Sequence, residues 1–358
     1  MTLLEALRAI PQEVRSVRID VEGKAGRVTA PMPEGQITVK FDAESGSDSC
    51  AVDGKVVRLA RALTGVGTAT KRGDKLRISA GNGSYSFSVV AGDSVPLVTE
   101  PFAWSALPVT AKALQTALAY VRTAAATDDI RYYLNGVLVH IADEFTAVAS
   151  NGHVAAIAID ALLGACAPTS IILPNKCVSE IVRLLAAAGS DEVVVETGRR
   201  ESGTAVLRVI VGPVTYLAVG IDGTFPEYQR VFAANEAASY AAFEAEAVSE
   251  AVKRLELTVQ PKNPSILMTL ADGSMKLAST ADPDKGGSET VAAAETFAGQ
   301  HECGVNPYYL ADAVNAALGQ AKNVAIGWLA PERAITIQPM AEEGKAATRK
   351  WIVMPLRV

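Results

Sequence analysis

The sequence predicts an α+β protein of three tandem, similar domains, each with two helices packed on a mainly antiparallel sheet. A helical pattern that begins at a turn-forming residue and is followed by a strand pattern occurs three times, opening at Asp53, Asn175 and Asn306. Between these points, apolar and polar residues alternate as they do in strands with one buried face. The openings lie a domain's length apart, far more than the unit of a solenoid repeat.

The first domain is predicted over residues 1–103 and is the shortest and most divergent of the three. Its first helix covers residues 3–10 and ends before Pro11, because proline cannot continue a helix. Its second helix, over residues 55–63, begins after Asp53 and precedes a strand at 76–78. Residues 85–89 alternate between polar and apolar side chains, as in a half-buried strand.

The second domain is predicted over residues 104–233. Its first helix covers 109–126 and its second 177–185, with a strand at 193–195. Asn175 is a good N-cap type, because its side chain can accept a hydrogen bond from a free amide of the first turn. The boundaries on both sides follow turn-rich segments.

The third domain is predicted over residues 234–358. Acidic residues gather at the start of its first helix, residues 245–257, where they complement the helix dipole. Its second helix covers 309–314 after an Asn306 cap and Pro307, and it leads to a strand at 324–326. A hairpin turn is expected at Asp272–Gly273, directly before the alternating run 274–278.

Length and composition indicate a folded, water-soluble chain. The 358 residues are 49% hydrophobic, with a mean hydropathy of +0.20, which suffices for two or three domains with cores. Apolar runs are too short for a membrane span of about 18 residues. Glu5 and Arg8 interrupt the apolar start, so no signal peptide is expected. A cytoplasmic location without membrane partners follows as the expectation.

An enzyme is the disfavoured alternative. Its candidate residues, Cys166, Cys177, His140 and His153, are scattered along the chain, and no phosphate-binding loop, dinucleotide fingerprint or nucleophile elbow is present. The cysteines, which also include Cys50 and Cys303, have no metal-ligand spacing. We therefore expect no catalytic residues, no metal and no cofactor.

Basic residues collect on the predicted helices of a chain whose net charge is −6. Residues 55–72 carry five cations and no acid, and residues 109–126 carry Lys112 and Arg122 and no acid. Solvated helix faces are one explanation. The other is a single positive surface on a protein that is otherwise negative, as expected of a chain that touches nucleic acid.

Four runs of residues carry the functional signal. The first is Arg131-Tyr132-Tyr133-Leu134-Asn135-Gly136, where the two tyrosines are expected to enter a strand and to face opposite sides of a sheet. The others are Ser150-Asn151-Gly152-His153, the run from Asp222 to Val231, and the terminal Val353-Met354-Pro355-Leu356-Arg357-Val358.

Taken together, these runs resemble the bacterial DNA polymerase III beta subunit family, the sliding clamps. The resemblance covers residues 104–358 well and the first domain loosely. It implies three similar domains per chain and a head-to-tail homodimer that forms a six-domain ring around duplex DNA. It also implies sequence-independent DNA binding, and partners that include the replicative polymerase, the clamp loader and other proteins carrying clamp-binding peptides.

The resemblance also implies site residues. The DNA-binding residues would be Lys55, Arg58, Lys112, Arg122, Arg131, Tyr132, Tyr133 and Lys176. The partner-peptide pocket would comprise Leu134, Ser150, Gly152, His153, Val154, Ala155, Pro226, Arg230, Val231, Val353, Met354, Pro355, Leu356, Arg357 and Val358.

The chain departs from the family pattern around Gly152–His153, where the family usually has an acidic residue before the pair and Arg-Leu after it. Asn151 and Val154-Ala155 stand there instead, so the preferred partner peptide stays open. Also open is whether the gene is cellular, phage or plasmid borne. An alternative function is a clamp-like peptide-binding scaffold that does not encircle DNA, which the short first domain and the acidic third domain suggest.

Overall fold

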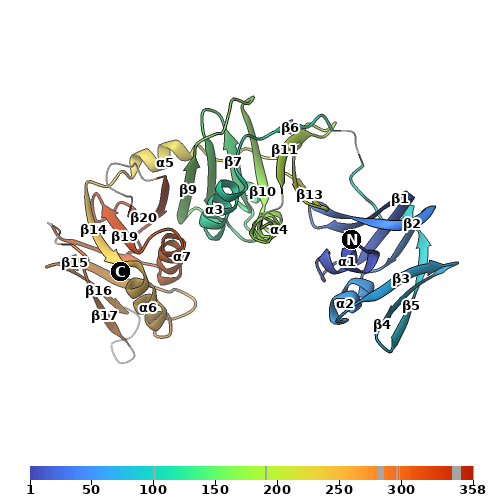
Figure 1. Ribbon diagram of the computed structural model, residues 1–358. Helices are drawn as coiled ribbons and strands as arrows, with labels where there is room; N and C mark the ends of the chain where they lie inside the picture. The colour runs from blue at the N-terminus through green and yellow to red at the C-terminus, as the bar shows by residue number, and fades with distance from the viewer. Residues whose placement is uncertain are drawn as a thin grey trace. The chain divides into compact units, whose positions relative to one another are not determined.

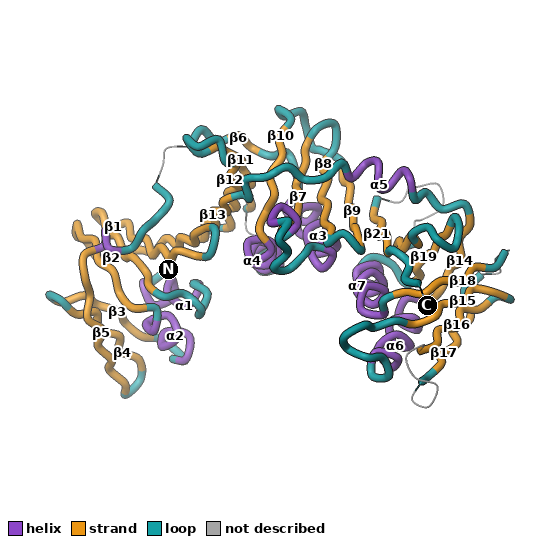
Figure 2. The backbone as a smooth tube through the Cα atoms, turned by 180° about the vertical axis from the view of Figure 1, so that it is seen from behind, coloured by secondary structure: helices purple, strands orange, loops and turns teal. Residues whose placement is uncertain are grey.

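The computed structural model describes residues 1–99, 102–189, 192–279, 286–295, 297, 299–340 and 348–357. The fold is α+β, as predicted, with short helices packed on antiparallel sheets (Figures 1 and 2). Two compact units can be distinguished. The first comprises residues 1–111 and 180–220, and the second comprises residues 112–179 and 221–358.

The first unit begins with α1 (Leu3–Ala9), which Thr2 and Glu5 cap reciprocally. Strands β1 (Ser16–Met32) and β2 (Gly35–Asp53) pair along their length. The second helix of the predicted plan is present as α2 (Lys55–Ala62). Its N-cap is Gly54, and the preceding Asp53 side chain accepts from the Lys55 amide at 2.7 Å. The 3₁₀ turn η1 (Gly92–Ser94) and the strands β3 (Gly67–Arg72), β4 (Lys75–Ala80) and β5 (Gly83–Ala91) follow.

One sheet runs through the first unit in the order β3-β4-β5-β2-β13-β12-β11-β6, with β1 beside β2. Its later strands are β6 (Ser105–Ala106), β11 (Val193–Arg199), β12 (Ala205–Val211) and β13 (Val214–Val219). Val214 of β13 pairs with Val39 of β2. Strands from the predicted first and second domains therefore hydrogen-bond in one sheet.

The second unit contains an eight-stranded sheet in the order β10-β7-β8-β9-β21-β20-β19-β14. The pairing of Val353 in β21 with Val154 in β9 joins the chain's end to the predicted second domain. The strands of this sheet are β7 (Gly136–Ile141), β8 (Phe145–Ser150), β9 (Val154–Asp160), β10 (Thr169–Pro174), β14 (Ser239–Glu244), β19 (Asn323–Trp328), β20 (Ile335–Pro339) and β21 (Arg349–Val353).

A separate four-stranded sheet in this unit has the order β17-β16-β15-β18. Asp272 and Gly273 have φ values of 50° and 70° between β15 and β16, so the predicted hairpin turn is confirmed. The strands are β15 (Ile266–Ala271), β16 (Ser274–Ser279), β17 (Ser288–Ala292) and β18 (His301–Val305).

The helix pairs predicted for the second and third domains are present, and α5 is an additional helix that the sequence did not predict. These helices are α3 (Ala111–Val121) with the 3₁₀ turn η2 (Arg122–Ala124), α4 (Asn175–Ala186), α5 (Tyr228–Ala234), α6 (Ala245–Glu256) and α7 (Pro307–Leu318). Helices α6 and α7 pack against each other (Figure 1). Asn306 caps α7 by accepting from the Tyr308 amide at 3.0 Å, and Pro307 is its first residue, as predicted. In the described part, no helix is both long and apolar enough to cross a bilayer.

Two local predictions are wrong. Asn175 does not cap α4: its side-chain oxygen accepts no hydrogen bond, and its amide group donates to the Ala126 carbonyl at 2.7 Å. Tyr132 and Tyr133 do not enter a strand but form the 3₁₀ turn η3 (Tyr132–Leu134), and β7 begins at Gly136. The Asn135 side chain closes this turn, because it bonds both the amide and the carbonyl of Asp129 at 2.9 Å each.

Candidate functional site

The segment Ser150–His153, here called the His153 loop, connects β8 and β9 and is held by its own side chains. Gly152 has a φ of +88°, a conformation that favours glycine. The Gly152 amide donates to the Ser150 hydroxyl at 3.1 Å. The Asn151 side-chain oxygen accepts from the His153 amide at 2.9 Å and from the Val154 amide at 3.0 Å. The departure from an acidic residue at 151 therefore leaves a neutral acceptor that shapes the turn.

The Arg131 side chain lies against this loop. Its guanidinium forms a fork on Asp129, with Nε 3.0 Å from Oδ1 and Nη2 2.7 Å from Oδ2, and Nη2 also donates to the Asn151 carbonyl at 3.1 Å. These bonds lower the pKa of Asp129 to about 2. The turn that carries the two tyrosines is thus connected to the His153 loop by one cation.

The C-terminal segment runs beside the same loop. The Met354 amide donates to the His153 carbonyl at 2.9 Å, and the Leu356 amide donates to the Gly304 carbonyl at 2.8 Å. The imidazole of His153 is exposed and stacks on the ring of Tyr309 in α7, with centroids 6.2 Å apart and an angle of 15° between the rings. The loop, the chain end and α7 therefore meet at His153.

Buried apolar residues support this surface from beneath. Ala155 of β9, Ile352 of β21 and Phe232 of α5 belong to one hydrophobic cluster. Partly buried Tyr133 and Tyr228 pack against it. This cluster brings α5, the strand of the terminal peptide and the strand after the His153 loop to one site.

The predicted pocket residues separate into two groups by exposure. Leu134, Val154, Ala155 and Val353 are buried and can only support the surface. The accessible members are Pro226, Arg230 and Val231 of the α5 region, Gly152 and His153 of the loop, half-buried Ser150 and Pro355, and Met354, Leu356 and Arg357 at the chain end. Val358 lies outside the described residues.

Tyr309 is a residue of this site that the sequence patterns did not predict. The run Asn306-Pro307-Tyr308-Tyr309 was interpreted only as a helix start, although it carries a second pair of adjacent tyrosines. Tyr308 is 40% exposed and Tyr309 is half-buried under His153. The tyrosine pair was the signal that could have identified it.

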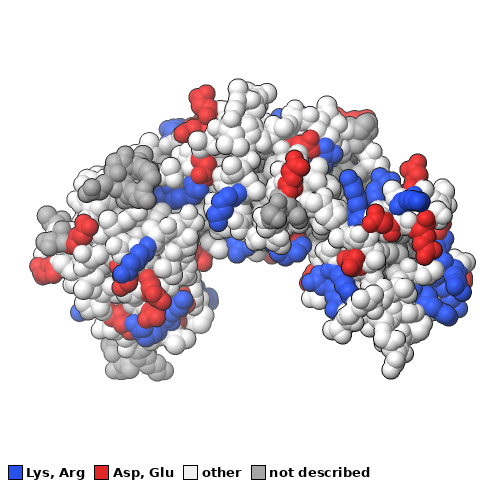
Figure 3. Space-filling view, viewed as in Figure 1, with Lys and Arg blue, Asp and Glu red and all other residues white. Residues whose placement is uncertain are grey.

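The predicted DNA-binding cations lie on exposed helix surfaces. Lys55 and Arg58 are on α2, Lys112 is on α3, Arg122 is in η2, and Lys176 is in the first turn of α4. Within the described residues, Lys112, Arg122 and Lys176 make no ion pair. In Figure 3, Lys and Arg side chains lie along the edge of the molecule beside α3 and α4.

The other predicted DNA-binding residues, Arg131, Tyr132 and Tyr133, contact other side chains or backbone groups of the protein. Arg131 is exposed, but its guanidinium is committed to Asp129 and Asn151. Tyr132 is 56% exposed and Tyr133 is half-buried, with their rings in edge contact at 5.8 Å. One phenol ring of the pair is therefore exposed to solvent, although the local structure is a turn and not the predicted strand.

The residues of the alternative enzyme reading do not converge. Cys177 is buried in α4, and His140 bonds the Tyr228 hydroxyl at 2.8 Å. His153 stacks on Tyr309 and has no nucleophile beside it in the described contacts. Among the described residues, no group of three or more His, Cys, Asp or Glu side chains is placed to hold a metal.

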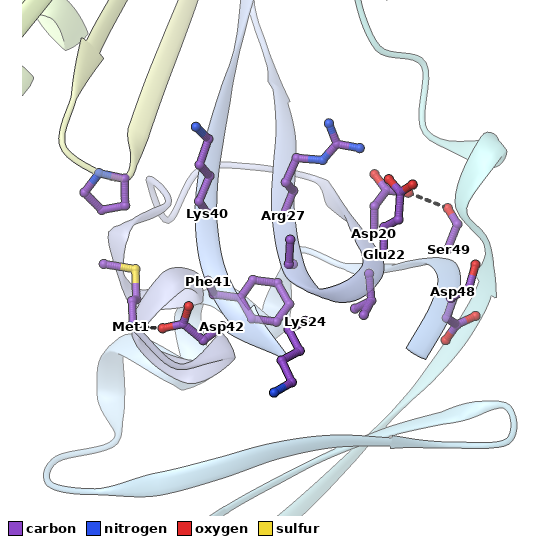
Figure 4. A pocket seen from close by; sticks show the side chains of 15 residues that line it. Met1, Asp20, Glu22, Lys24, Arg27, Lys40, Phe41, Asp42, Asp48 and Ser49 are labelled. Atoms are coloured by element: carbon purple, nitrogen blue, oxygen red, sulfur yellow. Dashed lines mark hydrogen bonds and ion pairs between the residues drawn. The ribbon is translucent and has the colours of Figure 1, made fainter. Parts of the chain in front are cut away.

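A hollow of about 1160 Å³ lies on β1 and β2 of the first unit (Figure 4). Arg27 and Lys40 occupy directly paired positions there, and the Phe41 ring lies where a Cβ on Gly26 would be. Asp20 and three other acidic residues also line it, so its charge is mixed. It contains none of the predicted site residues.

Comparison with known proteins identifies the family. Residues 108–227 match the model of the DNA polymerase III beta subunit central domain, and residues 229–357 match that of its C-terminal domain. The beta sliding clamp of Proteus mirabilis is 26% identical over 80% of this chain and 75% of its own length. That of Vibrio cholerae is 25% identical over 90% of this chain and 85% of its own.

Solved structures show the same fold. A DnaN sliding clamp from Pseudomonas aeruginosa, bound to griselimycin, has a TM-score of 0.85 at 21% identity, covering 100% of this chain and 97% of the other. A second structure of the beta subunit from that organism has a TM-score of 0.84 at 23% identity, covering 100% and 98%. The chain therefore belongs to the DNA polymerase III beta subunit family, the DNA sliding clamps.

Proposed function

We propose that two copies of this chain pair head to tail into a ring around duplex DNA and tether the replicative polymerase through a peptide bound beside His153. The observation that carries this proposal is the His153 site itself. There the loop, α5, α7 and the terminal peptide meet within the two matched domains. The protein contributes binding and no chemistry of its own, acts in the cytoplasm, and also serves the clamp loader and other partner proteins.

We propose three clamp domains per chain, at residues 1–103, 104–233 and 234–358. The two family matches, over 108–227 and 229–357, support the later boundaries. The sheets of the structure cross these boundaries through the β2–β13 and β9–β21 pairings. Each pairing joins strands of two predicted domains by backbone hydrogen bonds within one sheet.

The DNA contacts proposed here are weak and exchangeable. Lys112, Arg122 and Lys176 are exposed, and within the described residues they make no ion pair that would compete with phosphate. Lys55 and Arg58 provide the same charge on α2. A closed ring retains DNA by topology, so a few contacts to phosphates suffice and still permit sliding.

The head-to-tail interface is proposed between β5 of one copy and β17 of another. Over residues 83–88, one edge of β5 has no strand partner among the described residues, because β2 pairs with β5 only at residues 89–91. In the part of the chain that the structure describes, strand β17 likewise pairs only with β16. Strands β3 and β4 of the same sheet carry Lys71, Arg72, Lys75 and Arg77, whereas β17 carries Glu289. Pairing would cover both edges and bring opposite charges together.

The interface proposal has a direct test in the mass of the protein in solution. Wild type should be a dimer at micromolar concentration. Replacing Ser86 in the exposed part of β5 with proline removes one edge donor and should shift the protein toward the monomer. The equivalent change at Ser202, in an exposed turn, is the matched control and should leave the dimer unchanged. A wild-type monomer would overturn the proposed ring.

The peptide contacts are proposed at the exposed apolar side chains Val231, Met354 and Leu356, which are 41%, 43% and 37% exposed. Methionine adapts to different partner shapes. Two or three anchors of roughly 1.5–3 kcal/mol each, less the cost of ordering the peptide, give micromolar affinity. We propose that griselimycin, which a related clamp binds, occupies the same surface.

A clamp-like scaffold that does not encircle DNA is the second candidate. Helix α7 favours it, because it carries Asp312 and no basic residue. A processivity assay separates the candidates. On a primed circular template, the encircling clamp should lengthen the products made by its polymerase in each binding event. The scaffold would bind the polymerase without lengthening them, and that result would overturn the proposed function.

A further inference from the structure

The exposed cations of this chain fall into two kinds, and Arg131 belongs to the second. Lys112, Arg122 and Lys176 make no ion pair within the described part of the chain. Arg131 uses Nε and Nη2 on the Asp129 carboxylate and uses Nη2 again on the Asn151 carbonyl. Three of its five N–H donors are therefore engaged inside the protein.

We propose that Arg131 is a positioning residue for the partner-peptide surface and not a phosphate contact. This revises its sequence-based assignment to DNA, and it rests on the proposed function of the His153 site. The guanidinium fixes the His153 loop to the turn before β7 through Asn151. A positive charge alone could not connect the two segments in this way, because the planar guanidinium must donate to the Asp129 carboxylate and the Asn151 carbonyl at the same time.

The space beside the loop supports this role. A Cβ added to Gly152 would lie 2.9 Å from Nη1 and 3.0 Å from Nη2 of Arg131. Gly152 also has a φ of +88°, which side chains rarely adopt. The guanidinium and the bare backbone of Gly152 thus fit each other closely, and neither can move far without the other.

Hydrogen bonds and a ring contact connect the His153 loop to the proposed contact residues. The Asn151 carbonyl accepts from Arg131, while its side-chain oxygen holds the amides of His153 and Val154. The His153 carbonyl accepts from the Met354 amide, and its ring stacks on Tyr309. A loop that loses Arg131 would therefore shift His153 and Met354 together.

The test compares two substitutions at one position. Arg131→Lys keeps the positive charge but loses the fork, whereas Arg131→Gln loses both. Binding of labelled griselimycin and of a labelled duplex oligonucleotide is measured for each variant at several salt concentrations. We expect both variants to weaken griselimycin binding by about tenfold. Their DNA affinity and its salt dependence should match those of wild type.

A phosphate contact predicts the opposite pattern. Arg131→Lys would then behave like wild type toward both probes, and Arg131→Gln would weaken DNA binding and lower the salt slope by about one. Either result would overturn the inference. If wild type itself does not bind griselimycin, the proposed peptide surface fails instead, so the two failures are distinguishable.

Two further variants control for the fold. Arg18 also bonds a carboxylate two residues away, with its Nε donating to both oxygens of Asp20 at 2.8 and 3.0 Å, and it lies in the other unit. Arg18→Lys should leave griselimycin affinity unchanged. Gly152→Ala should weaken it as Arg131→Lys does, and the double variant should lose no more than either single one, because both act on one loop. Additive losses would contradict a shared mechanism.

Discussion

The imidazole of His153 lies parallel to the ring of Tyr309, with centroids 6.2 Å apart and 15° between the planes. His153 belongs to the loop before β9 and Tyr309 to α7, so the contact joins two segments that match different domains of the family. The same His153 residue accepts a hydrogen bond from the Met354 amide. The proposed peptide surface is therefore organised around one stacked pair.

Replacing Tyr309 with leucine should weaken griselimycin binding by about three- to tenfold, because an aromatic pair is worth roughly 0.5–1.5 kcal/mol beyond its buried area. Titration followed by fluorescence anisotropy measures the change. Tyr308→Leu, one residue earlier, is the control and should have a smaller effect, since no ring contact involves it among the described residues. Equal losses in the two variants would mean that the stack does not organise the surface.

Replacing Lys112 and Lys176 together with glutamine should reduce the salt dependence of DNA binding. Each cation that neutralises one phosphate contributes about 0.9 to the slope of log affinity against log salt, so the double variant should lose nearly two. The slope comes from DNA titrations at several salt concentrations. Lys262→Gln, at an exposed position between α6 and β15, is the control. An unchanged slope in the double variant would remove these lysines from the DNA surface.

Asp312 should make the protein less stable at neutral pH than in mild acid. Burial, and then the nearby Glu256 carboxylate, raise the pKa of Asp312 to about 6. Folding therefore favours the protonated carboxyl. The contribution of Asp312 to the free energy of unfolding falls as the pH rises from about 4, the pKa of aspartate in the unfolded chain, to about 6, its pKa in the folded protein. Asp312→Asn should thus raise stability by about 1–2 kcal/mol at pH above 7, a value reduced for partial exposure.

Thermal unfolding at two pH values checks this. Near the unfolded pKa, wild type and Asp312→Asn should unfold at nearly the same temperature, and above pH 7 the variant should unfold higher. Asp143→Asn, in the exposed turn between β7 and β8, should change neither value. A variant less stable than wild type above pH 7 would show that the carboxylate is stabilised where it lies.

The pairing of β9 with β21 should depend for its stability on the ion pair between Arg349 and Asp160. Arg349 is 7% exposed, its Nη2 lies 2.7 Å from Asp160, and its Nη1 donates to the Ile159 carbonyl at 2.8 Å. Asp160→Asn leaves a buried cation without its counter-ion and should cost about 2–4 kcal/mol in urea unfolding. Glu227→Gln breaks the exposed pair with Arg230 and should cost less than about 0.5 kcal/mol. Similar losses would argue against a special role for burial.

The sequence correctly predicted those elements that are specified by residues close together in the chain. Asn306 caps α7 as predicted, and Asp272–Gly273 makes the expected turn. The Tyr132–Tyr133 prediction failed because strand propensity was outweighed by the bonds between Asn135 and Asp129. No tyrosine pattern carries that information.

Contacts between distant segments could not be predicted in the same way. The pairings of β2 with β13 and of β9 with β21 join residues far apart in the chain, and no local pattern specifies their register. The position of Tyr309 under His153 depends on those pairings. So does the exposure that separates Met354, which can meet a partner, from Val353, which lies in the core.

The most direct test of the clamp function is retention on DNA whose ends are closed. The protein is loaded on nicked circular plasmid, separated from free protein by gel filtration, and measured again after a restriction enzyme cuts the circle. A ring held by topology should stay with the circle and be lost after linearisation. Equal retention before and after cutting would contradict a ring held by topology.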